Sequence, residues 1–456
     1  MNLLASFKNW LNGTTDGRVL GLFRIVFGLF MTYYCLYYHQ AQFIKQGLMA
    51  PAMHFKYEGF EWVGLLPEPA MRGILFAMGI AALLMTIGIW MKPATLFYAI
   101  GLSYFTLAEK AYYNNHIYLF ILLCVLLAFT DADRFFSARG NRNYGPVIPR
   151  WQIFLLQLQV CMVYFYGGLA KLSPDWLFRQ EPMRTMVTKY MGYDSVAAAY
   201  FLNYAGLLID LGAPLLLFYK PLRKWGVAAY MFFNLSNSQL FDDIGIFPFV
   251  MLTALLLYFE THELPWLRNF TGSAGFFQEP APNGKRAKKS TQPSVSALVP
   301  TGPAPLAPWL KWTLLAYWTF QCFFPFRGFF LPNPMDYTTI GNRFSWRMKI
   351  DTRTPEEVAY FVRLAKTGEE RQLKIETYLN PMQIKLLTMD PRAAADFAHY
   401  LRDKGEKVSG VPPKIRAQIK FAYNGRPAQY FVDSQIDLST VQHTPYQKLD
   451  WVLPLK

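Results

Sequence analysis

The chain has 456 residues, of which 53% are hydrophobic and 17% aromatic, and its formal net charge is +15. This composition supplies far more apolar surface than one soluble core needs, and much of it lies in runs near the length of a bilayer crossing. The Lys and Arg residues lie in short blocks between these runs and form no single basic face, which argues against a nucleic-acid partner and favours a role in membrane topology.

The first apolar run follows a start of mixed polarity. Residues 1 to 18 do not resemble a cleavable signal peptide, and the run from Val19 to Tyr38 is long enough to span a bilayer. We therefore expect this run to remain in the protein as the first membrane helix.

Apolar runs recur along the chain and predict a polytopic α-helical membrane domain of about nine helices. The predicted helices cover residues 19–38, 71–91, 94–109, 115–130, 151–171, 197–219, 223–240, 244–260 and 308–325.

The loops between these runs differ in charge, and cytoplasmic loops are usually rich in Lys and Arg. One set of loops carries Lys8, Arg18, Lys92, Arg134, Arg139, Arg142, Arg150, Lys220, Arg223, Lys224, Arg268, Lys285, Arg286, Lys288 and Lys289. The opposite set carries Asp242 and Asp243, but also Lys45, Lys56, Arg179, Arg184 and Lys189. On balance the N-terminus is predicted to be cytoplasmic, and nine crossings would place the tail on the outer face.

The tail differs from the rest of the chain. Residues 415–423 and 428–433 alternate as strands do, and Asn424-Gly425 between them is a hairpin signal, while residues 392–404 favour a helix. We divide the chain into a membrane domain (1–278), a Pro- and Ser-rich cytoplasmic linker (279–306), the ninth membrane helix (307–326) and a β-rich extramembrane domain (327–456).

The four cysteines lie within or beside apolar runs, without the spacing of a zinc site or a redox pair. We expect Cys35, Cys124, Cys161 and Cys322 to be buried thiols, and we predict no metal site.

Three groups of polar residues lie at helix ends, and the predicted topology places all three ends on the outer side of the membrane. Asn114, Asn115 and His116 open the fourth helix, Lys171 closes the fifth, and Asn237-Ser238-Gln239 closes the seventh. Ionisable groups at membrane depth are costly, which makes a function the default hypothesis. Chance is the alternative, because helix ends tolerate polar residues best.

Each of these residues has a structural and a functional interpretation. Lys171 is compatible with a lysine that extends its ammonium to the interface, or with a desolvated amine that accepts a proton. His116 fits a hydrogen-bonded helix-end histidine or a catalyst, and Asn114 and Asn115 could cap the helix or hold a ligand's oxygen. For Arg24 and Asp210, inside helices, a structural ion pair or cap is favoured.

These residues lie in segments that resemble one known family. Residues 113–119 read Y-N-N-H-I-Y-L, followed by T-D-A-D at 130–133; residues 167–176 read G-G-L-A-K-L-S-P-D-W; residues 237–241 read N-S-Q-L-F. In this order, these segments resemble the vitamin K-dependent γ-glutamyl carboxylases. The resemblance extends to Phe23-Arg24, Leu208 to Leu211, F-S-W at 344–346, Y-L-N-P at 378–381 and W-V-L-P at 451–454. The length would suit a short bacterial form with an HTTM membrane domain.

The resemblance implies an activity. In this family a lysine deprotonates vitamin K hydroquinone, whose reaction with O2 yields a strong base that removes a γ-hydrogen from a peptide glutamate, and the carbanion captures CO2. Carried over, Lys171 is the base and His116 a second catalytic residue. Asn114, Asn115, Asn237 and Gln239 would hold the quinone, and Trp346, Tyr378 and Asn380 would bind the glutamyl peptide or protein at the outer face.

The sequence departs from the family pattern at two of these sites. Ala170 replaces the first lysine of a K-K pair, and Asn234 stands where the family has a histidine. Two other functions therefore stay open: a quinone epoxidase that carboxylates no peptide or uses another acceptor, and a nonenzymatic membrane protein that binds lipid or a partner. For all three, we predict a multi-pass protein, with a bacterial inner membrane favoured.

Overall fold

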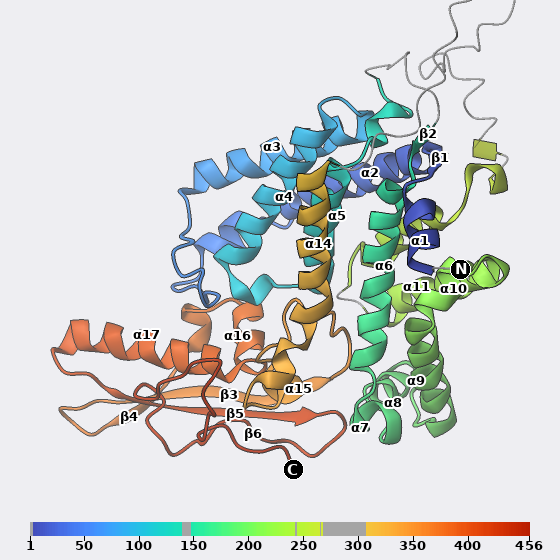
Figure 1. The fold of residues 1–456 in the computed structure, drawn as a ribbon. Coiled ribbons are helices and arrows are strands. Elements are labelled where there is room, and N and C mark those ends of the chain that lie inside the picture. Colours follow the sequence, from blue (N-terminus) through green and yellow to red (C-terminus); the bar gives the residue numbers. More distant parts are fainter. Residues whose placement is uncertain (1–2, 139–146, 242–243, 265, 268–306) are drawn as a thin grey trace, which may run out of the picture.

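The computed structural model describes residues 3–138, 147–241, 244–264, 266–267 and 307–456. The described chain is mostly helical, with a C-terminal region built on a β-sheet (Figure 1). The predicted linker 279–306 lies outside the described residues, as do Arg139, Arg142, Asp242, Asp243, Arg268 and the lysine-rich segment at 285–289.

Every predicted apolar run contains a helix. The helices are α2 (Arg18–Gln40), α3 (Glu68–Ile87), α4 (Met91–Ala108), α5 (Asn115–Ala128), α6 (Arg150–Ala170), α9 (Val196–Leu211), α10 (Ala213–Phe218), α11 (Lys220–Leu240), α12 (Phe247–Leu255) and α14 (Pro308–Phe323). The predicted sixth helix is two helices, because the chain breaks at Gly212 between α9 and α10. The prediction missed five α-helices of the described residues: α1 (Leu3–Leu11), α7 (Pro174–Phe178), α8 (Met183–Met191), α15 (Met335–Thr338) and α16 (Pro381–Leu387).

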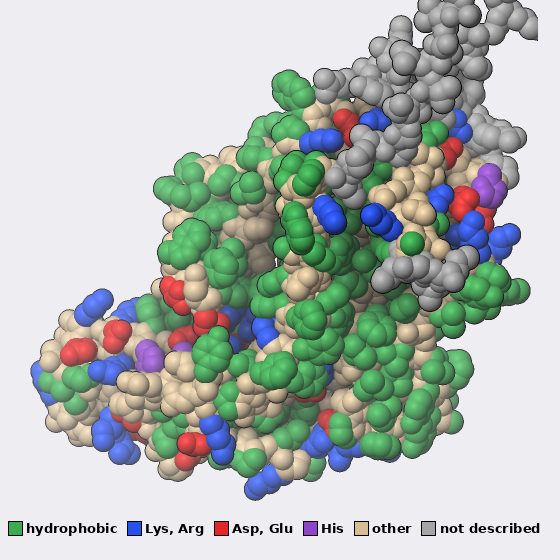
Figure 2. All heavy atoms as spheres, viewed as in Figure 1, with side chains coloured by type: hydrophobic (Ala, Val, Ile, Leu, Met, Phe, Trp, Pro, Cys, Tyr) green, Lys and Arg blue, Asp and Glu red, His purple; other side chains and the backbone are tan. Residues whose placement is uncertain are grey.

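Membrane character is supported by helix length and composition. Among the described residues, α2, α3 and α6 are long and apolar enough to cross a membrane, and α5, α9 and the segment 247–258 are shorter apolar helices. Figure 2 shows Lys, Arg, Asp and Glu side chains over the C-terminal region and at the opposite end, with largely hydrophobic surface between them. The number of crossings and their orientation stay predictions.

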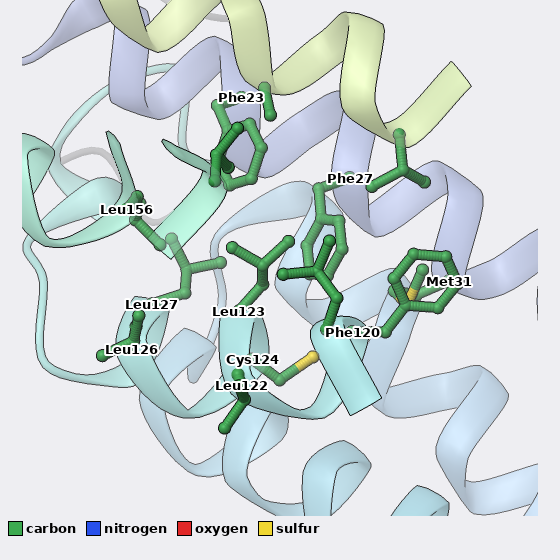
Figure 3. Packing of buried hydrophobic residues seen from close by; sticks show 14 of the residues in the cluster. Phe23, Phe27, Met31, Phe120, Leu122, Leu123, Cys124, Leu126, Leu127 and Leu156 are labelled. Carbon is green, nitrogen blue, oxygen red and sulfur yellow. The ribbon is translucent and has the colours of Figure 1, made fainter. Parts of the chain in front are cut away.

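The centre of the helical region is a dry aromatic and aliphatic core. Phe23, Phe27 and Met31 recur along one face of α2 and pack against Phe120 and Leu123 of α5 (Figure 3). All five side chains are fully buried, which places the first and fourth predicted segments side by side. The core thus fixes the direction in which α5 leaves the C-terminal region.

The prediction for the cysteines is confirmed in three cases and wrong in one. Cys35, Cys124 and Cys161 are buried free thiols, whereas Cys322 is exposed. Helix α14 buries one face, which carries Leu314 and Gln321, seven residues apart. Cys322 is the residue after Gln321, so its side chain is turned away from that buried face.

The C-terminal region has the predicted hairpin and helix. Strands β5 (Lys414–Tyr423) and β6 (Gln429–Tyr430) are antiparallel neighbours, joined by a turn in which Asn424 and Gly425 have positive φ angles of 47° and 67°. The four-stranded sheet has the order β4-β3-β5-β6, with β3 at Arg353–Arg363 and β4 at Glu370–Leu373. Helices α16 (Pro381–Leu387) and α17 (Pro391–Ser409) lie between the sheet and the helical region (Figure 1).

One small sheet was not predicted. Strand β1 (Thr14–Asp16) pairs antiparallel with β2 (Val147–Pro149), so the segment before α2 is joined to the segment before α6. Each strand has only three residues, which is too short for an alternating pattern to be recognised.

Ionic contacts join the C-terminal region to the helical region at Asp175, at Asp390 and at Glu58, which pairs with Arg392. Arg426, just after the β5–β6 turn, donates two hydrogen bonds to Asp175 of α7, at 2.6 and 2.8 Å. On the other side, buried Asp390 contacts Lys110 at 3.4 Å and Arg343 at 3.1 Å. Burial opposes the charge of Asp390, but the cations around it hold the pKa of this carboxyl well below its usual range.

Candidate functional site

Lys171 lies directly after the last turn of α6, where it is the C-terminal cap residue. Its ammonium donates a hydrogen bond to the Asp210 carboxylate near the end of α9, and both side chains are buried. Asp210 thus forms an ion pair, one of the two arrangements expected for it, and its partner is the lysine that the sequence singled out. A lysine that extends freely into the membrane interface does not describe this arrangement, because only 8% of the Lys171 side chain is exposed.

Two glycines of α6 allow α9 to come this close. A β-carbon at Gly168 would lie 2.7 Å from the backbone nitrogen of Leu211, which is too close for any side chain. A β-carbon at Gly167 would lie 3.2 Å from Asp210 Oδ2. The G-G pair therefore sets the separation between the two helices that carry Lys171 and Asp210.

Aromatic rings surround the Lys171 amine. Its Nζ lies 5.2 Å from the centre of the Trp176 ring and 5.6 Å from the centre of the Phe233 ring. Trp176 is held by reciprocal hydrogen bonds with Asn203 of α9, at 2.9 and 3.1 Å. Residues 203 and 210 are seven apart and share one face of α9, so the same helix face positions both the ring and the carboxylate.

The start of α5 is joined to the C-terminal region. The Asn115 amide donates to the Arg347 carbonyl oxygen at 3.2 Å, and its side-chain oxygen accepts from the Tyr113 hydroxyl at 2.9 Å. The same hydroxyl accepts from the backbone nitrogen of Phe344 at 2.5 Å. Asn115 therefore has structural partners in this state, in keeping with the interpretation that it needs no ligand.

The other two residues of this motif are less enclosed. Asn114 precedes α5 and is exposed, and its side chain makes no capping hydrogen bond. The His116 ring lies 5.6 Å from the Phe120 ring and 6.1 Å from the Phe247 ring at the start of α12. His116 thus faces Phe247 across the contact between α5 and α12.

Trp346 links the α5 motif to the α6 motif. Its ring stacks on Tyr118 of α5 at 4.9 Å, and its carbonyl oxygen lies 4.0 Å from where a β-carbon at Gly167 would be. The side chain is fully buried in the core of the helical region, although we expected it in a peptide-binding surface of the tail. The segment around Trp346 therefore passes between the start of α5 and the end of α6.

The N-S-Q segment ends α11 close to this site. Phe233 faces Lys171, and Asn237 follows it by one helical turn on the same side of α11. Asn237 is half-buried, whereas Gln239 is exposed and donates to Ser238 at 3.4 Å. Asn234, at the position of the family's histidine, is buried and donates to the Tyr164 hydroxyl at 2.9 Å.

Tyr378 and Asn380 lie at another junction. Asn380 caps α16 and donates to the Gly47 carbonyl and the Tyr112 hydroxyl, both at 3.1 Å. Tyr378 contacts Phe397 of α17, and the Lys404 ammonium lies 4.6 Å from its ring centre. The structure brings Asn115, Trp346 and Lys171 into one connected region and places Tyr378 and Asn380 against α16 and α17.

Three buried polar atoms in and beside the connected region have no hydrogen-bond partner among the described residues. These atoms are Asn203 Oδ1, Asp210 Oδ1 and Trp346 Nε1. A buried acceptor and a buried donor left unpaired are costly, and such sites often receive a ligand or water. Together with the rings of Trp176 and Phe233, these atoms give the region the mixed apolar and polar character that binding of a flat aromatic molecule with oxygen atoms requires.

The sequence did not reveal three of these residues as site components. Asp210 was recognised as a buried charge without a named partner, and Trp176 and Phe233 were not proposed. Trp176 lies inside the quoted G-G-L-A-K-L-S-P-D-W segment, and Phe233 lies one turn before Asn237. Helical spacing could have suggested Phe233, but nothing in the local sequence indicates that α9 faces α6.

Two family models match the chain. Residues 12–262 match the family model of the HTTM domain. Residues 307–456 match the family model described as the vitamin K-dependent gamma-carboxylase, lumenal domain. No solved structure matches the chain.

Proposed function

The chain belongs to the vitamin K-dependent γ-carboxylase family, and we propose that it adds CO2 to peptide glutamate. The reaction of vitamin K hydroquinone with O2 would drive this carboxylation. The observation that supports this activity most is the buried Lys171–Asp210 pair, set among aromatic rings beside unpaired polar atoms. A bound vitamin K hydroquinone would supply the electrons and the strong base that removal of a γ-hydrogen requires.

The pair offers a route to a neutral amine. In the ion pair Lys171 is an ammonium and Asp210 a carboxylate, and transfer of one proton from Nζ to the carboxylate gives an amine and a carboxylic acid with no change in total charge. Burial penalises the charged arrangement, so expulsion of water favours the neutral one. Lys171 can then accept a proton from a hydroxyl placed against it, which is the role of a general base.

The surrounding residues hold the reactants and exclude water. Trp176 and Phe233 provide flat apolar faces for a quinone ring, and Asn237, one turn beyond Phe233, is placed to hold one of its oxygens. We propose that Trp346 Nε1 donates a hydrogen bond to the glutamyl substrate. This buried donor lies on the segment that passes the end of α6, and it has no hydrogen-bond partner among the described residues. Asn380 donates hydrogen bonds to the Gly47 carbonyl and the Tyr112 hydroxyl, and in this proposal it acts as a positioning residue for this region.

One assay separates the candidate functions. The purified full chain in detergent is incubated with vitamin K hydroquinone, labelled bicarbonate and a glutamyl peptide, and both the epoxide and the incorporated label are measured. We expect both products, and we expect both to be lost in Lys171→Ala and in Lys171→Arg, because a guanidinium does not deprotonate. Asp194→Asn, at an exposed ion pair with Arg184, is the matched control that should retain both.

The other outcomes each identify a different protein. Epoxide without label would indicate a quinone epoxidase with another acceptor or none. Unchanged hydroquinone in a folded preparation would indicate a nonenzymatic membrane protein. Full activity in Lys171→Arg would contradict the assignment of the general base, whatever the products.

A further inference from the structure

Three side chains of metal-binding type meet on the C-terminal region, far along the chain from Lys171. Asp396 and His399 lie on α17, and His443 lies in the loop after β6. The first two are three residues apart and therefore share a helix face. One nitrogen or carboxylate oxygen from each residue lies within 4.8 Å of the other two. The chain has six histidines, and two of them meet here.

The orientation of His399 is set by a backbone contact. Its Nε2 lies 2.9 Å from the Val441 carbonyl oxygen. A carbonyl oxygen only accepts hydrogen bonds, so Nε2 carries the hydrogen and Nδ1 keeps the lone pair that a metal ion needs. Metal-binding histidines are usually held in this way, with the second ring nitrogen donating to a carbonyl or a carboxylate.

His443 completes the group from the same loop that provides the Val441 carbonyl. Its Nε2 lies 3.0 Å from Asp396 Oδ1, and its ring is parallel to that of His399 at 5.9 Å. The side chains of His443 and Asp396 are 16% and 34% exposed, so an ion can reach them from solution. Without an ion, the three residues form an ordinary ion pair and ring contact, which is the alternative that must be excluded.

We propose that Asp396, His399 and His443 bind a divalent ion of the zinc class. Two imidazoles and one carboxylate are a ligand set that zinc uses, and a water molecule would take the fourth position. Hard ions such as calcium and magnesium prefer six or more oxygen ligands, which this group does not offer. This proposal is independent of the carboxylase activity.

The bound ion would fasten the loop to α17. Val441 and Ile436 of this loop pack against the core of the C-terminal region, and Arg402 of α17 donates to the Ser439 carbonyl at 3.2 Å. Hydrogen bonds from Arg402 and His399 and the His443–Asp396 pair already connect this loop to α17, and a bound ion would strengthen that connection. An ion that binds the folded state and not the unfolded state stabilises the folded state.

The test uses the full chain in detergent after treatment with a chelator. Equilibrium dialysis with zinc chloride measures the ions bound per chain, thermal unfolding measures stability with and without zinc, and the visible spectrum with cobalt(II) chloride reports nitrogen and oxygen ligation directly. The variants are His399→Ala, His443→Gln and Asp396→Asn. His39→Ala, which removes an exposed imidazole at the end of α2, is the control.

We expect one zinc ion per wild-type chain, a higher unfolding temperature with zinc, and a ligand-field spectrum with cobalt. Loss of either histidine should weaken zinc binding at least about tenfold and abolish the zinc-dependent rise, while His39→Ala should behave as wild type. No stoichiometric zinc in the wild type, or binding that survives in both histidine variants, would overturn the proposal. If the variants do not fold, the absence of a cobalt spectrum in the wild type would overturn it.

Discussion

The ammonium of Lys171 and the carboxylate of Asp210 contact each other in a buried environment, although the residues lie 39 positions apart in the chain. The contact joins the end of α6 to the end of α9 and depends on two glycines that let these helices approach. The proposed function has these two groups share a proton, and that proposal predicts several measurable properties of the protein.

Replacement of Asp210 tests its role as the proton acceptor. Asp210→Asn keeps the shape of the side chain but cannot take a proton from the Lys171 ammonium, so we expect kcat for epoxide formation to fall about 100-fold or more. Steady-state kinetics with vitamin K hydroquinone measure this effect. Asp194→Asn, a carboxylate in an exposed pair, should keep the wild-type rate. Wild-type kcat in Asp210→Asn would show that the carboxylate takes no part in proton transfer.

Close packing of α6 against α9 predicts a glycine effect. In Gly168→Ala the new methyl group would meet Leu211 at 2.7 Å, so the helices must separate, at a cost of about 1–3 kcal/mol in the free energy of unfolding. The Lys171–Asp210 contact would lengthen and the carboxylation rate would fall. Gly73→Ala in α3 is the matched control, since a β-carbon there meets nothing within 4 Å. Equal stability of the two variants in thermal unfolding would contradict this packing.

Replacement of the buried Trp346 distinguishes a role in packing from a role in substrate binding. Trp346→Phe removes the Nε1 donor, which has no partner among the described residues, and keeps most of the ring. We expect little loss of stability, because a buried unpaired donor costs free energy. If Nε1 binds the glutamyl substrate, KM for the peptide should rise about tenfold or more, by loss of a hydrogen bond to a charged group. An unchanged KM would leave Trp346 a packing residue.

Acid sensitivity is predicted for the contact at Asp390. Its carboxylate is buried with Lys110, Arg343 and Arg392, which hold its pKa well below the usual range. A lowered folded-state pKa stabilises the fold above the unfolded-state pKa of about 3.9, and this contribution is lost as the pH falls through the folded-state pKa.

The matching experiment compares the wild type with Asp390→Asn across pH. At pH 7 we expect the variant to lose about 3–5 kcal/mol, because it leaves buried cations without their anion. The difference should shrink as the pH falls below about 4, because Asp390 takes up a proton in the unfolded chain there while its folded-state pKa is lower. A difference that stays constant down to pH 3 would show that the carboxylate charge is not its source.

Much of this protein could be predicted from local patterns. Apolar runs located α2 to α6, α9 to α12 and α14, because length and hydropathy are properties of each segment alone. Asn424-Gly425 indicated the β5–β6 hairpin for the same reason, since the turn depends on two adjacent residues. Lys171 stood out because a charge at the end of an apolar run is conspicuous whatever surrounds it.

The partners of these residues could not be predicted in this way. Asp210 meets Lys171, and Trp346 enters the core beside Tyr118, only because α5, α6 and α9 pack at particular positions. The convergence of Asp396, His399 and His443 likewise depends on how the last loop folds over α17. Side-chain contacts between distant segments are set by the packing of whole helices and sheets, and that packing minimises the free energy of the complete chain, so no single segment encodes it.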